Sequence, residues 1–249
     1  AGDSTWAITG PNAGTIGGVS FSGMENLTGG AGTDTFALSA EGSISGILNG
    51  GGGADVLDLS ALAGPITVNL ASSSSTAVHR FTSIAKVVGG PGDDSLLGPN
   101  ANSTWTLSAA GVGTVGSVAF EGFEVPQGGT GNDNFRLLVA ASLFARLDGG
   151  AGNDSLTAPN ETNDWQVSGP DTGSLAGQTF ISFENLIGGS VGDRFRLSDG
   201  SSVSGSVQGR SGRDILDFSA MTSPVTVNLQ DRTVAGVVAS FSSIQEGIG

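Results

Sequence analysis

The chain has 249 residues, of which 37% are hydrophobic and 43 are glycine, and its formal net charge is −14. The hydrophobic content and length are enough for a sizeable core, which excludes a disordered tail, and glycine does not recur at every third position, which excludes collagen. The negative charge disfavours nucleic-acid binding, and we expect no membrane insertion because no apolar run approaches the roughly 20 residues that cross a bilayer.

The absence of cysteine excludes disulfides, thiolate metal sites and cysteine nucleophiles. Combined with the acidity and a single lysine, it favours an extracellular protein or a protein of the bacterial cell surface. The chain begins Ala1-Gly2-Asp3 with neither an initiator methionine nor a signal peptide, and we expect it to be a segment of a longer repeat protein.

One hexapeptide, Gly-Gly-x-Gly-x-Asp, recurs along the chain. Its starts are 21, 39, 39, 21, 39 and 21 residues apart, which are one or two multiples of about 20. Five copies are complete and the last two are degraded: GGAGTD (29–34), GGGGAD (50–55), GGPGDD (89–94), GGTGND (128–133), GGAGND (149–154), GGSVGD (188–193) and GRSGRD (209–214). The spacing predicts further corners of the chain near Gly10, Leu70, Ala109, Gly169 and Leu229.

Longer repeats contain these hexapeptides. Related stretches begin at Trp6, Trp105 and Trp165, and the first and third stay aligned without a gap as far as the next hexapeptide. In the same way, DVLDLSALAGPITVNL (55–70) returns as DILDFSAMTSPVTVNL (214–229). Because no linker or change of composition interrupts the series, we predict one continuous domain over 1–249.

Short alternating segments follow the corners. An apolar residue lies two positions after the corner aspartate in all seven copies, at Phe36, Leu57, Leu96, Phe135, Leu156, Phe195 and Leu216. Such alternation predicts a strand with one buried face. Five phenylalanines precede corners by eight residues and are expected to stack in the interior: Phe21, Phe81, Phe120, Phe180 and Phe241.

A unit of about 20 residues cannot bury its own apolar face, so neighbouring units must stack. We therefore predict an all-β fold, a parallel and right-handed β-solenoid (β-helix) with about 12 coils of about 20 residues. Glycine at the corners allows positive φ angles and close approach of stacked backbones. Two asparagine pairs are expected to form polar ladders or to cap turns: Asn26 with Asn185, and Asn69 with Asn228.

The hexapeptides, each with its apolar residue in register, resemble the haemolysin-type calcium-binding (RTX) repeat, and the segments around them resemble parts of giant bacterial adhesins. The resemblance spans nearly the whole chain. It implies a secreted or surface β-roll in which the aspartates of two adjacent corners bind Ca²⁺ together. It implies three candidate metal-binding pairs: Asp34 with Asp55, Asp133 with Asp154, and Asp193 with Asp214.

The sequence departs from that family, in which the repeats run in unbroken tandem. Here the hexapeptides are isolated, and Arg194, Arg210 and Arg213 crowd the last candidate pair, where they could replace a cation with an ion pair. The alternative is that the hexapeptide survives as a turn whose aspartate accepts hydrogen bonds from corner amides. Both the calcium-bound and the calcium-free solenoid stay open at this point.

Few residues offer acid–base chemistry. His79 and Lys86 are the only residues of their types, and both are expected at the surface. Asp58 and Asp217, which lie near Asp55 and Asp214, alternate with inward-facing residues and are expected to face solvent. We predict no catalytic residues and no enzyme activity, and a polysaccharide-processing β-helix enzyme is the least favoured of three alternatives.

The favoured function is a structural one, as a stalk, fibre or adhesin spacer of a giant bacterial surface or secreted protein. Its expected partners are neighbouring repeats of the same protein, and unpaired coil ends could also associate end to end. The alternative is a glycan-binding or protein-binding face, for which Trp6, Trp105 and Trp165 would be the aromatic candidates. Their alternation with apolar residues predicts that they are buried instead.

Overall fold

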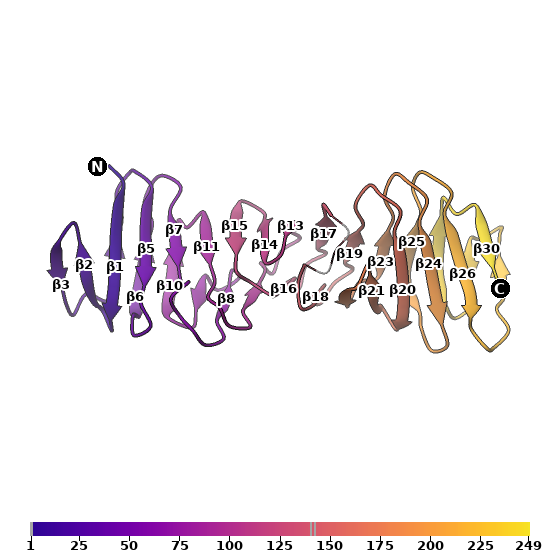
Figure 1. The fold of residues 1–249 in the computed structure, drawn as a ribbon, viewed down its shortest axis with the longest axis horizontal. Helices are drawn as coiled ribbons and strands as arrows, with labels where there is room; N and C mark the ends of the chain where they lie inside the picture. The colour runs from indigo at the N-terminus through magenta and orange to yellow at the C-terminus, as the bar shows by residue number, and fades with distance from the viewer. Residues whose placement is uncertain (1, 140, 142) are drawn as a thin grey trace. The chain divides into compact units, whose positions relative to one another are not determined.

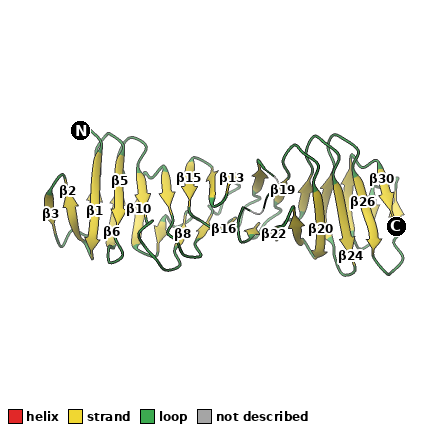
Figure 2. Cartoon of the chain, viewed as in Figure 1, coloured by secondary structure: helices red, strands yellow, loops and turns green. Residues whose placement is uncertain are grey.

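The computed structural model describes residues 2–139, 141 and 143–249. Over these residues the secondary structure consists of strands and turns, with no helix (Figure 2). The described part of the chain accordingly holds no helix long and apolar enough to cross a membrane. The strands belong to two compact units: unit 1 comprises Ala1–Pro99 and Gly111–Pro126, and unit 2 comprises Asn100–Ala110 and Gln127–Gly249.

The strands of unit 1 are β1 (Ser4–Gly10), β2 (Ala13–Ile16), β3 (Val19–Phe21), β4 (Leu27–Thr28), β5 (Asp34–Leu38), β6 (Ile44–Asn49), β7 (Val56–Asp58), β8 (Thr67–Asn69), β9 (Ser74–Ser75), β10 (Val78–Thr82), β11 (Lys86–Val88), β12 (Ser95–Leu97), β14 (Val112–Val115) and β15 (Val118–Glu121). β16 (Val125–Gln127) has its first two residues in unit 1 and its last in unit 2.

The strands of unit 2 are β13 (Thr104–Ala109), β17 (Asn134–Leu137), β18 (Leu147–Asp148), β19 (Ser155–Thr157), β20 (Asp164–Gly169), β21 (Thr172–Leu175), β22 (Gln178–Ile181), β23 (Asn185–Ile187), β24 (Arg194–Ser198), β25 (Val203–Gln208), β26 (Ile215–Ala220), β27 (Val227–Asn228), β28 (Thr233–Val234), β29 (Val238–Ser242) and β30 (Glu246–Ile248).

Parallel stacking of successive coils builds each unit, as the sequence predicts (Figure 1). In unit 1 the parallel series β1–β5–β7–β11–β15 forms one sheet, β4–β6–β10 forms a second, and β8 pairs with β12 in a third. In unit 2 one series runs β13–β17–β19–β23–β25–β29 and another runs β20–β24–β26–β30. The all-β parallel β-solenoid is therefore confirmed.

The number of coils differs from the prediction: the solenoid has about 8 turns instead of about 12. Gly10 and Gly169 lie at the ends of β1 and β20, where the chain folds back into the antiparallel strands β2 and β21. Leu70 and Leu229 likewise follow β8 and β27, which pair antiparallel with β9 and β28. These four predicted corners are therefore reversals within antiparallel segments, and they do not begin new coils.

Antiparallel meanders lengthen some coils. Each of the three tryptophan stretches forms strands that fold back on one another, as in β1–β2–β3 of unit 1 and β20–β21–β22 of unit 2. Thr35 pairs with Val56 across consecutive hexapeptides, whereas Lys86 pairs with Ala119, which lies in the last strand of a meander and therefore further along the chain. A uniform period therefore overcounts the coils.

The predicted inward-facing residues form the core. All seven apolar residues that follow the corner aspartates are buried, and so are Phe81, Phe120 and Phe180. Phe21 and Phe241 are only half-buried. Each tryptophan stacks on the phenylalanine that is its parallel partner one strand along, with ring centroids 5.7 Å apart for Trp6–Phe36, 4.8 Å for Trp105–Phe135 and 5.4 Å for Trp165–Phe195.

The paired asparagines cap backbone amides at equivalent places, as predicted. The Oδ1 atoms of Asn26 and Asn185 accept hydrogen bonds from the backbone N–H of Ile47 and Ser206 on the next coil. Asn69 and Asn228 instead accept from amides of the turns that follow them, at Ser72 and at Gln230 and Asp231. At equivalent places in the repeat, the asparagine side chains therefore accept hydrogen bonds from backbone N–H groups.

Candidate functional site

The six predicted metal-binding aspartates lie in buried corners of the solenoid. Each is at most 1% exposed, and the structure brings the members of all three pairs together on adjacent coils. The backbone N–H of the first aspartate donates to Oδ1 of the second, over 2.7 Å for Asp34–Asp55, 2.7 Å for Asp133–Asp154 and 2.8 Å for Asp193–Asp214. A hydrogen bond therefore links the two members of each pair across adjacent coils.

We call the corners at 29–34, 128–133 and 188–193 first corners, and those at 50–55, 149–154 and 209–214 second corners. In a first corner, Oδ2 of the aspartate accepts a hydrogen bond from the backbone N–H four residues earlier, at Gly30, Gly129 or Gly189. In unit 2, Oδ1 also accepts from the preceding coil: Asp133 from the N–H and hydroxyl of Ser103, and Asp193 from the N–H and side-chain amide of Asn163.

Second corners have a different backbone. The residue that would donate to Oδ2 has a positive φ angle, 97° at Gly51, 94° at Gly150 and 67° at Arg210. In the two complete copies its N–H donates instead to Asn49 or Asp148, two residues earlier. As a result, Oδ2 of each second-corner aspartate is buried without a hydrogen-bond donor among the described residues: Asp55, Asp154 and Asp214.

The hydrogen-bond series continues through three residues that the sequence analysis missed. Glu124 accepts from the backbone N–H of Asp94, Glu184 from that of Asp154, and Gln245 from that of Asp214, over 2.6–2.8 Å. We call the corner aspartates with these three residues the carboxylate–amide ladder. Their sequence signal is position, because each lies directly before a strand: Glu124 before β16, Glu184 before β23 and Gln245 before β30.

Burial changes the acidity of the ladder. It raises the pKa of Asp154 from 3.8 to about 6; the N–H of Asp133 opposes this shift, and the nearby carboxylates of Glu184, Asp133 and Asp148 add to it. Burial also raises the pKa of Asp193 and Asp214. The protein therefore holds several carboxylates in unit 2 that ionise less readily in the folded state than in the unfolded state.

The calcium sites that the resemblance implies at these corners stay a prediction, and the oxygens buried there without a hydrogen-bond donor among the described residues are Oδ1 of Asp34 and Oδ2 of Asp55, Asp154 and Asp214. Ca²⁺ takes six to eight oxygen ligands, whereas most oxygens of the ladder already accept hydrogen bonds from amides. At a second corner, a backbone carbonyl oxygen of the next coil lies close to the first glycine of the hexapeptide, on the side of the unpartnered Oδ2. At Gly149 this oxygen is Ser182 O, and the carboxylate oxygen is Oδ2 of Asp154. The described residues also hold no cluster of three or more histidine, cysteine or acidic side chains suited to a metal.

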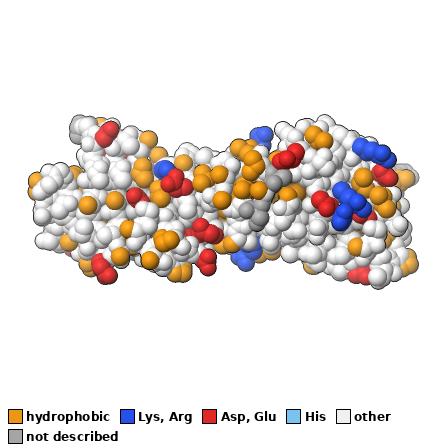
Figure 3. Space-filling view, viewed as in Figure 1, with side chains coloured by type: hydrophobic (Ala, Val, Ile, Leu, Met, Phe, Trp, Pro, Cys, Tyr) orange, Lys and Arg blue, Asp and Glu red, His pale blue; other side chains and the backbone are white. Residues whose placement is uncertain are grey.

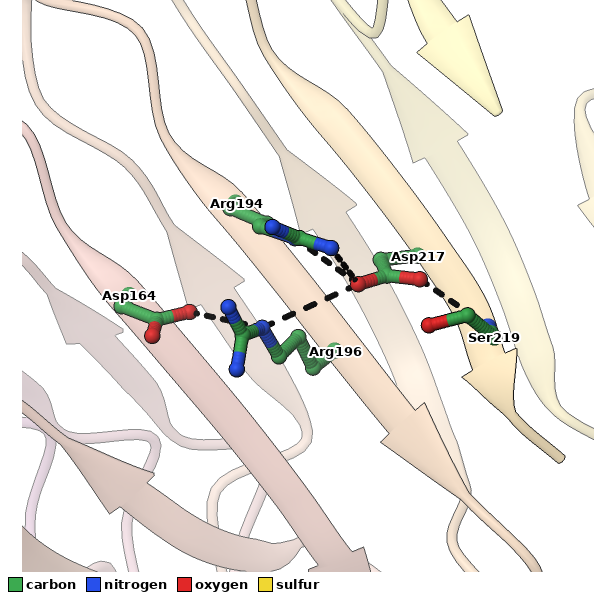
Figure 4. A network of polar contacts seen from close by, with 5 residues as sticks. All are labelled: Asp164, Arg194, Arg196, Asp217 and Ser219. Atoms are coloured by element: carbon green, nitrogen blue, oxygen red, sulfur yellow. Dashed lines mark hydrogen bonds and ion pairs between the residues drawn. The ribbon is translucent and has the colours of Figure 1, made fainter. Parts of the chain in front are cut away.

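A second charged group lies on the outer face of unit 2, over β20, β24 and β26 (Figure 4). Arg194 donates from Nε to Oδ2 of Asp217 over 2.8 Å and again from its terminal nitrogen. Arg196 lies between Asp164 and Asp217, with its Nε 3.3 Å and 3.7 Å from their carboxylates. In the space-filling view, basic and acidic side chains gather on one part of the surface (Figure 3).

This network corrects two sequence-based expectations. Asp217 is only 1% exposed, because the arginines of the neighbouring strand cover it. Burial alone would raise the pKa of Asp217, but hydrogen bonds from Ser219 and Arg194 hold it below its ordinary value. Arg194 pairs with Asp217 and Arg213 with Glu246, so these arginines do not take the place of a cation at Asp193 and Asp214. Asp58 is half-buried.

The remaining candidates lie as the sequence predicts, with one exception. His79 is exposed, and Lys86 is partly exposed and pairs with Glu121 at 2.7 Å. Trp105 and Trp165 are fully buried, whereas Trp6 is half-buried between Phe21 and Phe36. The tryptophans therefore belong to the core and present no exposed aromatic platform for a sugar.

A scan against models of protein families finds no match, and a search of curated proteins finds no similar sequence. The resemblance to RTX repeats therefore rests on the hexapeptides alone.

The raised pKa values predict that mild acid stabilises unit 2. A carboxyl whose folded pKa is about 6 and whose unfolded pKa is 3.8 binds more protons in the folded state between these values. The free energy of unfolding therefore increases as the pH falls through this window, by on the order of 1–3 kcal/mol for Asp154 alone. The lowered pKa values of Asp199 and Asp217 have the opposite effect on the free energy of unfolding, but only at pH values below the ordinary pKa of aspartate.

Urea denaturation followed by circular dichroism at about pH 7 and about pH 4.5 measures this effect. The matched variant is Asp154→Asn, which keeps an oxygen acceptor for the N–H of Asp133 and cannot ionise. We expect it to have a weaker pH dependence than the natural sequence. A free energy of unfolding that falls steadily from neutral pH to about pH 4.5 in both proteins would contradict the assignment.

Proposed function

We propose that the chain is a structural segment, a β-solenoid spacer in the stalk or fibre of a long bacterial surface or secreted protein. The observation that carries this proposal is the carboxylate–amide ladder, which recurs in both units and joins adjacent coils at six of the seven corner aspartates. A ladder of buried hydrogen bonds at the corners adds to the strand hydrogen bonds and resists separation of the coils. Each coil extends the structure by about 4.8 Å.

The proposed extracellular location is supported by the acidic composition, the absence of cysteine and the resemblance of the corners to secreted repeats. The alternative of a glycan-binding face has lost its aromatic candidates, because the tryptophans pack in the core. The surface positions of His79 and Lys86 likewise give no support to an enzyme. The proposal treats the corner carboxylates as hydrogen-bond acceptors, which makes the solenoid independent of calcium.

Single-molecule stretching in the presence of EDTA tests this function directly. We expect stepwise unfolding in which coils detach one at a time or in small groups, because each coil contacts mainly its neighbours. With roughly 20–35 residues in a coil, each detached coil should add about 70–120 Å of chain. A spacer needs this resistance whether or not it carries a binding face.

The calcium arm of the same experiment uses millimolar Ca²⁺ and a thermal scan by circular dichroism as its control. Equal unfolding forces and equal midpoints in EDTA and in calcium agree with the proposal. A large rise in the midpoint with calcium would show that the folded state binds the ion, and would reassign the corner aspartates as ligands. Extension without measurable resistance in both conditions would contradict a structural role.

A further inference from the structure

A groove of about 390 Å³ lies on unit 1, between the segment that follows β8 and the strand β10. Its lining consists of three serines and two basic residues: Ser72, Ser74, Ser75, His79 and Arg80. No carboxylate of the described residues lines this groove, although the chain has a formal net charge of −14. We call it the serine–arginine groove. Its volume falls in the range of sites that bind small molecules.

His79 and Arg80 lie on the same side of β10 although they are consecutive. Val78 and Phe81 are buried, and both residues between them are exposed. Strict alternation along a strand would turn one of the two inward. The register of β10 against β6 shifts between Val78 and Arg80, and an irregularity of this kind can redirect a side chain. The strand therefore presents an imidazole and a guanidinium to the groove together.

The backbone holds the serines beside β10. Ser73, at the tip of the turn, has a φ angle of 51°, and its carbonyl oxygen accepts a hydrogen bond from the N–H of Phe81 over 2.7 Å. Oγ of Ser75 accepts from the N–H of Val78 over 3.0 Å. These two hydrogen bonds join the turn to the strand. The serine side and the basic side of the groove are therefore fixed relative to each other.

The groove has more hydrogen-bond donors than acceptors. Oγ of Ser72 and Oγ of Ser74 lie 2.8 Å apart, so one hydroxyl donates to the other and the second keeps its hydrogen. The oxygen of Ser75 is used by a backbone N–H, which leaves its O–H as a donor. Neither His79 nor Arg80 has a hydrogen bond or an ion pair among the described side chains. A guanidinium carries five N–H groups, and an imidazole carries at least one.

The chain contains an equivalent segment without these donors. β27 pairs with β28 in the register in which β8 pairs with β9. Arg232 has a φ angle of 54° and accepts from the N–H of Phe241, as Ser73 does from Phe81. In this segment Asp231, Val234, Ala239 and Ser240 take the places of Ser72, Ser75, His79 and Arg80. The fold therefore does not require the basic and hydroxyl side chains of the groove.

We propose that the serine–arginine groove binds a tetrahedral oxyanion, a sulfate or phosphate group that is free or carried by a sugar. Arg80 supplies a positive charge and paired N–H donors, and His79 supplies a further N–H. The serine hydroxyls approach from the turn. A tetrahedral group has oxygens that can meet donors from both sides of the groove at once, whereas a carboxylate has only two oxygens in one plane. This inference is independent of the proposed spacer function.

The histidine supplies a probe that is specific for this groove. Because the chain has one histidine, its imidazole proton resonances can be followed by NMR in the full-length protein. Sodium sulfate and glucose 6-sulfate are titrated at constant pH, with sodium chloride at matched ionic strength and glucose as references. We expect both sulfate compounds to give a saturable shift, with a dissociation constant of about 1 mM or lower, and the two references to give none.

Two variants copy residues of the equivalent segment, which makes them compatible with the fold. Arg80→Ser removes the guanidinium, and Ser72→Asp places a negative charge in the groove. Each should weaken the binding of sulfate by at least about tenfold. The control is Arg136→Ser, which removes the same charge from an exposed position on β17 of unit 2 and should bind like the natural sequence. Circular dichroism without ligand checks that all variants are folded.

A shift no larger with sulfate and glucose 6-sulfate than with chloride would overturn the proposal. So would equal weakening by Arg80→Ser and Arg136→Ser, because net charge and not the groove would then attract the anion. Tighter binding of glucose 6-sulfate than of sulfate would support a sugar as the carrier, whereas equal affinity would support the free oxyanion as the ligand. Loss of the spacer function in the stretching experiment would not change any of these results.

Discussion

Replacing Asp94 with alanine is expected to lower the free energy of unfolding of unit 1 by about 2–6 kcal/mol, because two backbone donors lose their acceptor at about 1–3 kcal/mol each. Asp94 is 0% exposed. Its Oδ1 accepts from the N–H of Ile66 at 2.8 Å and its Oδ2 from the N–H of Gly90 at 2.7 Å. Urea denaturation followed by circular dichroism measures the change.

The neighbouring residue supplies the matched control. Asp93 has the same charge and belongs to the same corner, but it is exposed. Asp93→Ala should change the free energy of unfolding by less than about 0.5 kcal/mol. If both variants lose the same stability, net charge rather than the hydrogen bonds of Asp94 controls the corner, and the carboxylate–amide ladder is not a source of stability.

The ladder explains why a motif known for binding calcium can persist in isolated copies. Among the described residues, six of the seven corner aspartates donate their backbone N–H to a side-chain oxygen one coil later, on another aspartate or on Glu124, Glu184 or Gln245. Asp55 is the exception. Glutamine at this position cannot supply a formal charge to a cation. All of these side chains can accept a hydrogen bond, but glutamine carries no charge. The feature that recurs at this position is therefore a hydrogen-bond acceptor and not a negative charge.

The strand positions and the pairing of the corners could be predicted from the sequence because they depend on short periods. Alternation identifies the buried face, and the regular spacing of the hexapeptides places Asp34 beside Asp55 without further information. The number of coils could not be predicted in this way. Glycine and asparagine form hairpin turns as readily as coil corners, so Gly10 and Leu70 carry no local signal that separates the two.

The failure at Asp217 has a different physical cause. Its parity in the strand correctly places it on the outer face, opposite to Leu216 and Phe218. Its exposure depends on Arg194 and Arg196, which belong to the next strand of the stack and cover it. Only the register of β24 against β26 brings these residues together, and register between coils of unequal length is not visible in sequence.

The second large effect is expected for Trp165→Ala, which should lower the free energy of unfolding of unit 2 by about 3–5 kcal/mol. Trp165 is 0% exposed, stacks on Phe195 at 5.4 Å and meets the edge of Phe180 at 5.9 Å. Removing the indole leaves a cavity between these rings, because the strands paired on both sides of β20, namely β24 and β21, limit collapse. Urea denaturation again measures the loss.

Trp6 provides the comparison, because it makes the same two kinds of ring contact, with Phe36 and Phe21, but is only half-buried. Trp6→Ala should therefore cost less than Trp165→Ala, since part of the indole already contacts water. The same pair of variants separates the structural function from glycan recognition. If Trp165→Ala kept its stability and lost affinity for a polysaccharide, the tryptophans would be binding residues; a loss of stability identifies them as the core on which the coils stack.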